Sequence, residues 1–266
     1  MQVFRPIQHA RTADEVAHQI EALILEGVLR VGERLPGERE LASETGVSRP
    51  IVREALKSLE TRGIIESRHG EGTFVADIIG TVFTPQVSGL LASHRKATFD
   101  YLEYRREVEG VTARLAAMRA TPADRELLIE LMERMEDAWR NDDFEAEALI
   151  DVEFHSLIGE IAHNLILLHT LRSCYRLLSE GVFQNRSRLY QAPGGRDALY
   201  RQHCAIANAI LAGDGDKAME ASRKHMDYVM EATRELELRE DRERISSLRL
   251  AQREDPYTRG KTRKHA

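Results

Sequence analysis

Residues 151–155, with the sequence Asp-Val-Glu-Phe-His, place a carboxylate and an imidazole four positions apart within an apolar-periodic run. Positions i and i+4 of a helix lie on one face, so Asp151 and His155 would share that face. Such a pair can form an ion pair, supply two ligands to a metal ion, or carry out acid–base chemistry. The rest of the chain has to distinguish these possibilities.

Two more histidines lie in predicted helices of the same half of the chain, each near an apolar stripe: His203 in YRQHCAIANAIL and His225 in EASRKHMDYV. Three imidazoles and one carboxylate from three helices can meet in the core of a bundle, which is how bundles build metal sites. This donor set suits Zn²⁺ best, with Ni²⁺, Mn²⁺ or Fe²⁺ as alternatives. Because such histidines are more commonly hydrogen-bonded core residues, spacing alone leaves both interpretations open.

The composition indicates a soluble, helix-rich protein with one large domain or two ordinary ones. The chain has 266 residues, of which 42% are hydrophobic and 31% charged. Two cysteines make no disulfide framework, and no apolar run approaches the ~18 residues of a membrane span. With no secretory signal at the N-terminus, we expect a cytoplasmic protein without a membrane partner.

The net charge of −6 argues against a nucleic-acid partner for the chain as a whole, but electrostatic footprints are local. Residues 49–68 and the tail 239–266 each carry more Lys and Arg than Asp and Glu. A basic patch on one element is therefore compatible with DNA binding.

The N-terminal part has the element order of a winged helix-turn-helix. Thr12 can cap a first amphipathic helix, a short second helix ends at Gly46, and Ser48 can cap a third. Two short strands then flank a glycine-rich turn in IIESRHGEGTFVAD. We predict a mainly α protein with an α+β winged helix-turn-helix at 8–77, a linker at 78–97, an all-α helical bundle at 98–238 and a charged tail at 239–266. We expect this tail to be a frayed helix at first and then disordered.

The third helix of this motif enters the DNA major groove, and its first residues suit contact with phosphate. Arg49 and Arg53 lie four residues apart on one face, where arginine can fork onto guanine. Arg68 and His69 lie at the tip of the wing. The alternative, a solvated charged face, does not account for the order of the elements.

The segment LILEGVLRVGERLPGERELASETGVSRPIVREALKSLETRGIIESRHGEGTFV resembles the DNA-binding domain of the GntR family of bacterial transcription regulators. The resemblance implies DNA contact by six residues: Arg39, Ser48, Arg49, Arg53, His69 and Gly70. Residues 98–236 resemble the helical FCD domain of the FadR branch of this family. In its metal-binding members the matching ligands would be Asp151, His155, His203 and His225. Acyl-CoA-responsive members lack this set, which argues against that effector.

The family resemblance also implies an effector pocket into which Arg105 points from the first helix of the bundle. Arginine is suited to binding a carboxylate. A 2-hydroxy or 2-keto acid can chelate a metal, and the chain is most similar to the glycolate-, lactate- and pyruvate-responsive regulators. The alternative for Arg105 is a surface ion pair with Glu109.

These expectations amount to a metal-containing, ligand-responsive regulator that binds a palindromic double-stranded operator as a homodimer and is not an enzyme. It is a repressor in one interpretation, although the family also contains activators. Two alternatives stay open at this point. One is a metal-dependent enzyme of the helical-bundle type, which would leave residues 12–76 without a role. The other is a DNA-binding regulator whose metal is purely structural.

Overall fold

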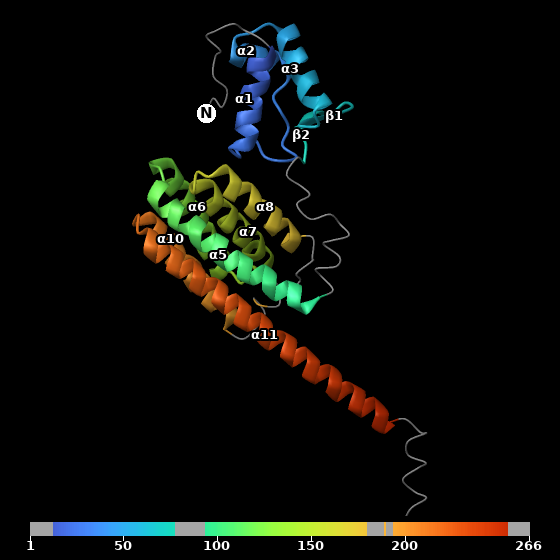
Figure 1. The fold of residues 1–266 in the computed structure, drawn as a ribbon, viewed down its shortest axis with the longest axis vertical. Helices are drawn as coiled ribbons and strands as arrows, with labels where there is room; N and C mark the ends of the chain where they lie inside the picture. Colours follow the sequence, from blue (N-terminus) through green and yellow to red (C-terminus); the bar gives the residue numbers. More distant parts are fainter. Residues whose placement is uncertain (1–12, 78–93, 180–188, 190–193, 255–266) are drawn as a thin grey trace, which may run out of the picture.

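The computed structural model describes residues 13–77, 94–179, 189 and 194–254 (Figure 1). The N-terminal unit consists of α1 (Ala13–Leu25), α2 (Glu38–Thr45), α3 (Arg49–Thr61), β1 (Ile65–Arg68) and β2 (Gly72–Val75). The two strands pair antiparallel, with Ile65 opposite Val75. This is the predicted order of a winged helix-turn-helix.

Amphipathic spacing builds the core of this unit. Val16, Ile20 and Ile24 recur on one face of α1 and are buried against apolar residues of α2, α3 and the hairpin. The wing turns at Gly70, whose φ of 78° lies in the left-handed region that glycine adopts without strain. The core therefore fixes α3 and the wing relative to each other.

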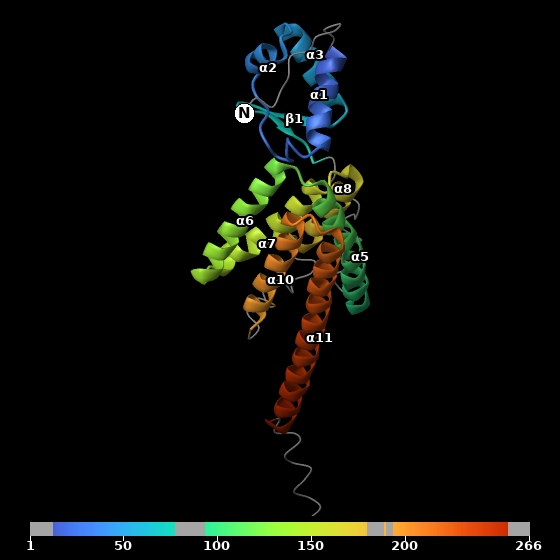
Figure 2. The same cartoon turned by 90° about the vertical axis from the view of Figure 1, so that its left-hand side faces the viewer.

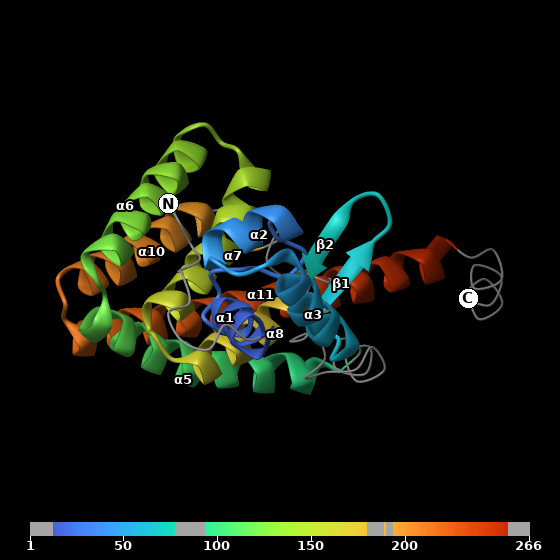
Figure 3. The ribbon, with the colours of Figure 1, turned by 90° about the horizontal axis from the view of Figure 1, so that it is seen from above.

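The C-terminal unit is a helical bundle, seen from two further directions in Figures 2 and 3. Its described helices are α5 (Arg95–Arg119), α6 (Pro122–Arg140), α7 (Phe144–Ile161), α8 (Leu165–Ser179), α10 (Gly195–Leu211) and α11 (Gly215–Glu254). Its main core joins α5, α6, α7 and α10 through buried residues such as Ala116, Leu128, Phe154 and Ile210. The described part of this unit contains no strand, as predicted, and none of the described helices is long and apolar enough to cross a membrane.

The tail at 239–266, predicted as a frayed helix followed by disorder, continues α11 as a regular helix to Glu254. Helix α11 contains no glycine or proline between Gly215 and its last residue, Glu254. Ion pairs at helical spacing support it, such as Arg239 with Glu243 at 3.0 Å. Residues 255–266, the predicted cap Thr12 and most of the predicted linker lie outside the described residues, and the last three linker residues already belong to α5.

Candidate metal centre, effector pocket and DNA-contact surface

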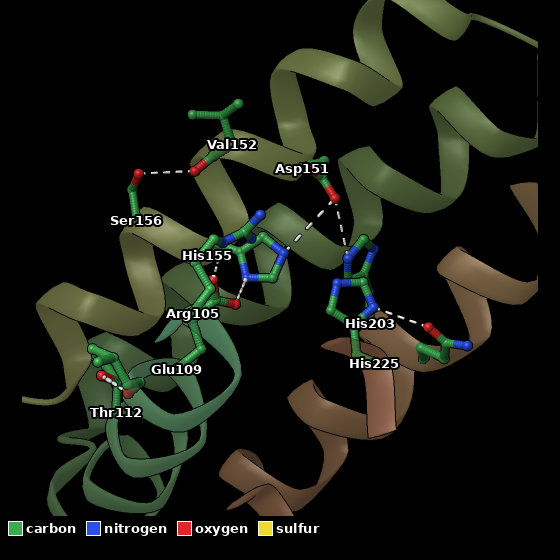
Figure 4. Close-up of polar contacts among 11 residues, drawn as sticks. Arg105, Glu109, Thr112, Asp151, Val152, His155, Ser156, His203 and His225 are labelled. Atoms are coloured by element: carbon green, nitrogen blue, oxygen red, sulfur yellow. Dashed lines mark hydrogen bonds and ion pairs between the residues drawn. The ribbon is translucent and has the colours of Figure 1, made fainter. Parts of the chain in front are cut away.

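Three histidines from three helices converge in the core of the bundle. His155 lies on α7, His203 on α10 and His225 on α11, and their exposed fractions are 4%, 1% and 2%. One ring nitrogen of each lies within 4.8 Å of one ring nitrogen of both others. Figure 4 shows the rings facing one another across the gap between the helices. The histidines predicted from sequence are therefore brought together.

Asp151 borders this histidine group. Its Oδ1 atom lies 3.1 Å from Nε2 of His203 and 3.8 Å from Nε2 of His155 (Figure 4). The carboxylate is almost fully buried, with 3% exposed. One turn of α7 thus presents both Asp151 and His155 to the same point, as the four-residue spacing predicted.

Hydrogen bonds on the outer edges of two rings orient them toward the centre. Nδ1 of His155 lies 3.1 Å from Oε2 of Glu109, and Nδ1 of His225 lies 2.9 Å from Oε1 of Gln202. Because these oxygens accept hydrogen bonds, each Nδ1 donates, and Nε2 is the ring atom that faces the centre and could bind a metal. Nε2 of His155 is buried without a hydrogen-bond partner within the described part of the chain.

Electrostatics favour the protonation states that a metal site needs. Burial lowers the pKa of His225 well below its ordinary value, and the neighbouring His203 and His155 lower it further. Burial alone raises the pKa of the Glu109 carboxyl, but Arg105 and His155 outweigh burial and leave that pKa below its ordinary value. A neutral imidazole and an ionised carboxylate behind another imidazole are the arrangement found around metal ligands. The residues present therefore fit a divalent metal.

Arg105 is buried beside this centre rather than exposed. Its Nε atom donates a 2.6 Å hydrogen bond to Oε1 of Glu109, and its exposed fraction is 4%. Burial lowers the pKa of the Arg105 guanidinium, but Glu109 with Tyr101 and Tyr175 raises it more, so the group stays charged. The alternative of a surface ion pair is therefore wrong: Arg105 does pair with Glu109, but the pair is buried.

A small cavity of about 10 Å³ lies beside His155 and Glu109. Tyr175 forms part of its wall, with its ring 5.2 Å from Cζ of Arg105 and 5.6 Å from the ring of His155. Glu109, Thr112, Ile158, Leu171, Ile206 and Ser222 line it as well, together with His155. This volume holds about one water molecule, so a larger ligand requires the surrounding side chains to move.

Sequence reasoning missed Tyr175 and Gln202 and did not foresee that Glu109 would contact His155. The only available signal was the four-residue spacing between Arg105 and Glu109. Tyr175 stands in an ordinary apolar helix pattern, and nothing in that pattern shows that α8 passes over the arginine. Its role depends on how α8 packs against α5.

The six predicted DNA-contact residues, Arg39, Ser48, Arg49, Arg53, His69 and Gly70, are all exposed on α2, α3 and the wing. Two of these arginines contact the carboxylate of Glu38. Nε and Nη2 of Arg53 donate to its Oε1 and Oε2 atoms at 3.0 and 2.8 Å. Nη2 of Arg49 lies 3.6 Å from the Oε2 atom. Ser48 occupies the N-cap of α3, but the predicted side-chain cap is wrong, because its side chain makes no capping hydrogen bond. Its exposed hydroxyl is therefore not used to cap α3.

Helix α8 also contacts the DNA-binding unit. Nε2 of His169 lies 2.9 Å from the carbonyl oxygen of Leu25, near the end of α1. Glu160 of α7 accepts from Arg172 at 2.7 Å and lies 3.5 Å from Arg30 of the N-terminal unit. Since Tyr175 lies on the same helix as His169, one element joins the cavity beside His155 to the DNA-binding unit.

Comparison with known proteins agrees with both halves of the structure. Residues 12–75 match the gntR family of bacterial regulatory proteins, and residues 100–228 match the FCD domain. The chain is 40% identical to an L-lactate dehydrogenase operon regulatory protein of Escherichia coli K12, over 82% of this chain and 85% of that protein. It is 36% identical to the Glc operon transcriptional activator of the same strain, over 84% of this chain and 89% of the activator.

Among solved structures, a GntR protein of Streptococcus agalactiae is similar, with a TM-score of 0.52 and 28% identity over 82% of this chain and 99% of that one. This similarity extends over both the DNA-binding unit and the bundle. The chain therefore belongs to the gntR family of bacterial regulatory proteins, carries an FCD domain as its C-terminal half, and is a transcriptional regulator rather than an enzyme.

Proposed function

We propose that this protein is a cytoplasmic, metal-containing regulator that binds a palindromic operator as a homodimer and responds to a small carboxylate. The observation that carries the proposal is the convergence of His155, His203 and His225 beside Asp151, next to a buried arginine. A purely apolar core would not bury four such groups.

His155, His203, His225 and Asp151 would hold the metal, with Zn²⁺ favoured by three imidazoles and one carboxylate. Ni²⁺, Mn²⁺ and Fe²⁺ accept the same donors and take more ligands. The bound ion would supply Lewis acidity for the carboxylate and adjacent oxygen of a 2-hydroxy or 2-keto acid. Within the described ranges, Arg105 uses only Nε for hydrogen bonding, which leaves its two Nη groups to donate to a carboxylate.

The class of effector is supported by the names of the relatives. One is named for the L-lactate dehydrogenase operon and another for the Glc operon. Because the cavity of about 10 Å³ holds about one water molecule, a two- or three-carbon acid such as glycolate, lactate or pyruvate would require less side-chain movement than a larger ligand. The acid would displace water and move the side chains around Tyr175.

Operator binding would use the exposed residues of α2, α3 and the wing. A single recognition helix reads only a few base pairs, so useful specificity requires two half-sites, and the two-fold symmetry of a dimer matches a palindrome. Arg49 and Arg53, held by Glu38, would present guanidinium groups to the major groove.

A purely structural metal is the second candidate, because the small cavity also suits a closed site. The two are separated by His203→Ala and by a thermal-shift screen of metal-loaded protein against glycolate, lactate and pyruvate. We expect the variant to lose metal by elemental analysis while operator affinity is retained, and one acid to raise the melting temperature only when metal is bound. Full metal content in His203→Ala would contradict the site, and a melting temperature unchanged by every acid would leave the metal structural.

A further inference from the structure

A cleft of about 510 Å³ lies between α3 and the hairpin of the wing. Figures 1 and 3 show these elements next to each other. Arg53 and Lys57 line the cleft from α3, Ser67 and Thr73 line it from the two strands, and Arg34 lines it from the segment that precedes α2. Arg34 and Lys57 are not among the six residues predicted to contact DNA, so those predicted contacts leave their role open.

Arg34 and Lys57 differ from the neighbouring arginines in having no carboxylate partner. Arg53 donates two hydrogen bonds to Glu38, and Arg49 lies 3.6 Å from the same carboxylate. Neither Arg34 nor Lys57 forms an ion pair within the residues that the structure describes, and both side chains are exposed. Their positive charges are therefore available to an anion from outside the chain.

The hairpin holds Arg34 and is itself tied to α3. The backbone of Arg34 forms a β-bridge with Phe74 of β2. A Cβ atom added at Gly72 would lie 2.7 Å from Nε of Arg34, so the absence of a side chain at Gly72 lets the arginine lie against the hairpin. Glu60 of α3 accepts a 3.2 Å hydrogen bond from the N–H of Ser67 on β1. The two walls of the cleft are therefore fixed relative to each other.

Two carboxylates also line the cleft, and they do not cancel its positive charge. Glu38 is paired with two arginines, and Glu60 is a single negative charge against both Arg34 and Lys57. The hydroxyl groups of the two lining residues on the strands add neutral donors. Phosphate oxygens in protein–DNA complexes accept hydrogen bonds from arginine, lysine, serine and threonine side chains. The lining of the cleft therefore suits a phosphate group.

The position of the cleft agrees with the path of a bound duplex. In the proposed operator complex α3 lies in the major groove, and the tip of the wing lies at the neighbouring minor groove. Two neighbouring grooves of a duplex are separated by one sugar–phosphate strand, so that strand has to pass between α3 and the wing. Because each strand carries one phosphate about every 3.4 Å along the helix axis, a phosphate comes within reach of the cleft.

We propose that Arg34 and Lys57 form a clamp for a phosphate of the DNA strand that runs between these two grooves. The inference rests on the proposed operator binding by α3 and the wing, and it adds a contact to the DNA backbone. Because a phosphate carries no sequence information, the clamp sets the position of α3 on the duplex and does not read bases. The reading of bases is left to the arginines held by Glu38.

The salt dependence of DNA binding by the full-length protein tests the clamp. Arg34→Gln and Lys57→Gln should each lower the slope of log affinity against log salt by about 1, and the double variant by about 2. Fluorescence anisotropy should give the same change on an operator duplex and on a random-sequence duplex. Arg62→Gln is the matched control, because Arg62 is an exposed cation that pairs with Glu21, and it should keep the wild-type slope. A wild-type slope in either cleft variant would overturn the clamp, which requires both residues.

Arg34→Lys separates the charge of this residue from its packing against Gly72. It should keep the wild-type slope, whereas the slope of Arg34→Gln in Arg34→Lys would show that the arginine only shapes the hairpin. Single uncharged methylphosphonates in the operator backbone then locate the contact. One position between the grooves should weaken the wild type and leave the double variant unaffected, and equal losses in both proteins at every position would refute the clamp. Operator binding with unchanged slopes would refute the clamp alone, whereas a wild-type protein that binds no operator would refute the proposed function.

Discussion

Glu109 bridges two buried groups of opposite role: its Oε2 atom lies 3.1 Å from Nδ1 of His155, and its Oε1 atom accepts a 2.6 Å hydrogen bond from Arg105. One carboxylate therefore neutralises the arginine of the proposed effector pocket and orients a histidine of the candidate metal centre. Any movement of Arg105 toward a bound acid would act on the same carboxylate. This contact would couple the candidate metal centre to the proposed effector pocket.

Replacing Glu109 with Gln should affect both metal affinity and stability. The variant leaves the charge of Arg105 buried without its counter-charge, which costs about 3–5 kcal/mol of unfolding free energy. It also weakens the support of His155, for which we expect about 10- to 100-fold lower zinc affinity. Urea denaturation and competitive zinc titration measure the two effects. The exposed Glu103→Gln on the same helix is the control, and equal behaviour of the two variants would remove Glu109 from this role.

Arg49→Ala should reduce operator affinity by about 1–3 kcal/mol if the guanidinium reads a base. The loss should be smaller on unrelated DNA, because only the base contact depends on sequence. Fluorescence anisotropy with operator and scrambled duplexes measures both. Arg62→Ala is the matched control, since Arg62 pairs with Glu21 near the opposite end of α3. A loss that is the same on both duplexes would assign Arg49 to phosphate contact.

His169→Ala should weaken communication between the halves of the protein. Burial lowers the pKa of His169, and the nearby charge of Arg172 lowers it further. These two effects outweigh the hydrogen bond to the carbonyl of Leu25, which raises that pKa. The ring is therefore neutral near neutral pH and donates to this carbonyl. Allosteric coupling is commonly about 1–3 kcal/mol, and operator must then change the effector dissociation constant by the same factor as effector changes operator affinity.

Calorimetry with and without operator measures this factor. We expect it to move toward one in His169→Ala while metal content stays unchanged. Thr170→Ala on the same helix is the control, because the Thr170 hydroxyl donates to the carbonyl oxygen of Ile166 within α8. An unaltered factor in His169→Ala would show that α8 does not carry the coupling.

Acid stability should depend on Asp124, which completes the capping box at the start of α6 with Thr121. Burial raises the pKa of this carboxyl, but the N–H of Thr121 and the side chain of His163 lower it more, so the folded-state pKa lies below its ordinary value. A lowered pKa means that the stabilisation is present above the unfolded value, about 3.9, and is lost as the pH falls through the folded value.

Asp124→Asn should therefore be about 1 kcal/mol less stable than the wild type at pH 7, in the range of a lost cap. The difference should shrink as the pH falls below about 4, because the carboxyl is protonated there first in the unfolded state and, at still lower pH, in the folded state. Urea denaturation across this range measures it. A difference that is constant from pH 7 to pH 3 would show that the charge of Asp124 does not contribute.

Local patterns in the sequence determined the element types and several residue pairs. Apolar residues at helical spacing, glycines at helix ends and the short strands around Gly70 predict the winged helix-turn-helix and the bundle. The four-residue spacing placed Asp151 with His155, and Arg105 with Glu109, because a helix repeats every 3.6 residues. In the tail, however, charge density predicts a frayed helix and then disorder, whereas the same charges form helical ion pairs in α11.

Only the tertiary structure decided what these pairs do. His203 and His225 are about fifty and seventy residues from His155 in the chain, and helical periodicity cannot specify which faces of α7, α10 and α11 meet. That packing buries the pair of Arg105 and Glu109 and makes it the support of a candidate metal ligand. It also lays α8 across both the cavity and the end of α1. Burial and contacts between distant segments arise from how helix faces fill the core together, which no local stretch of sequence encodes.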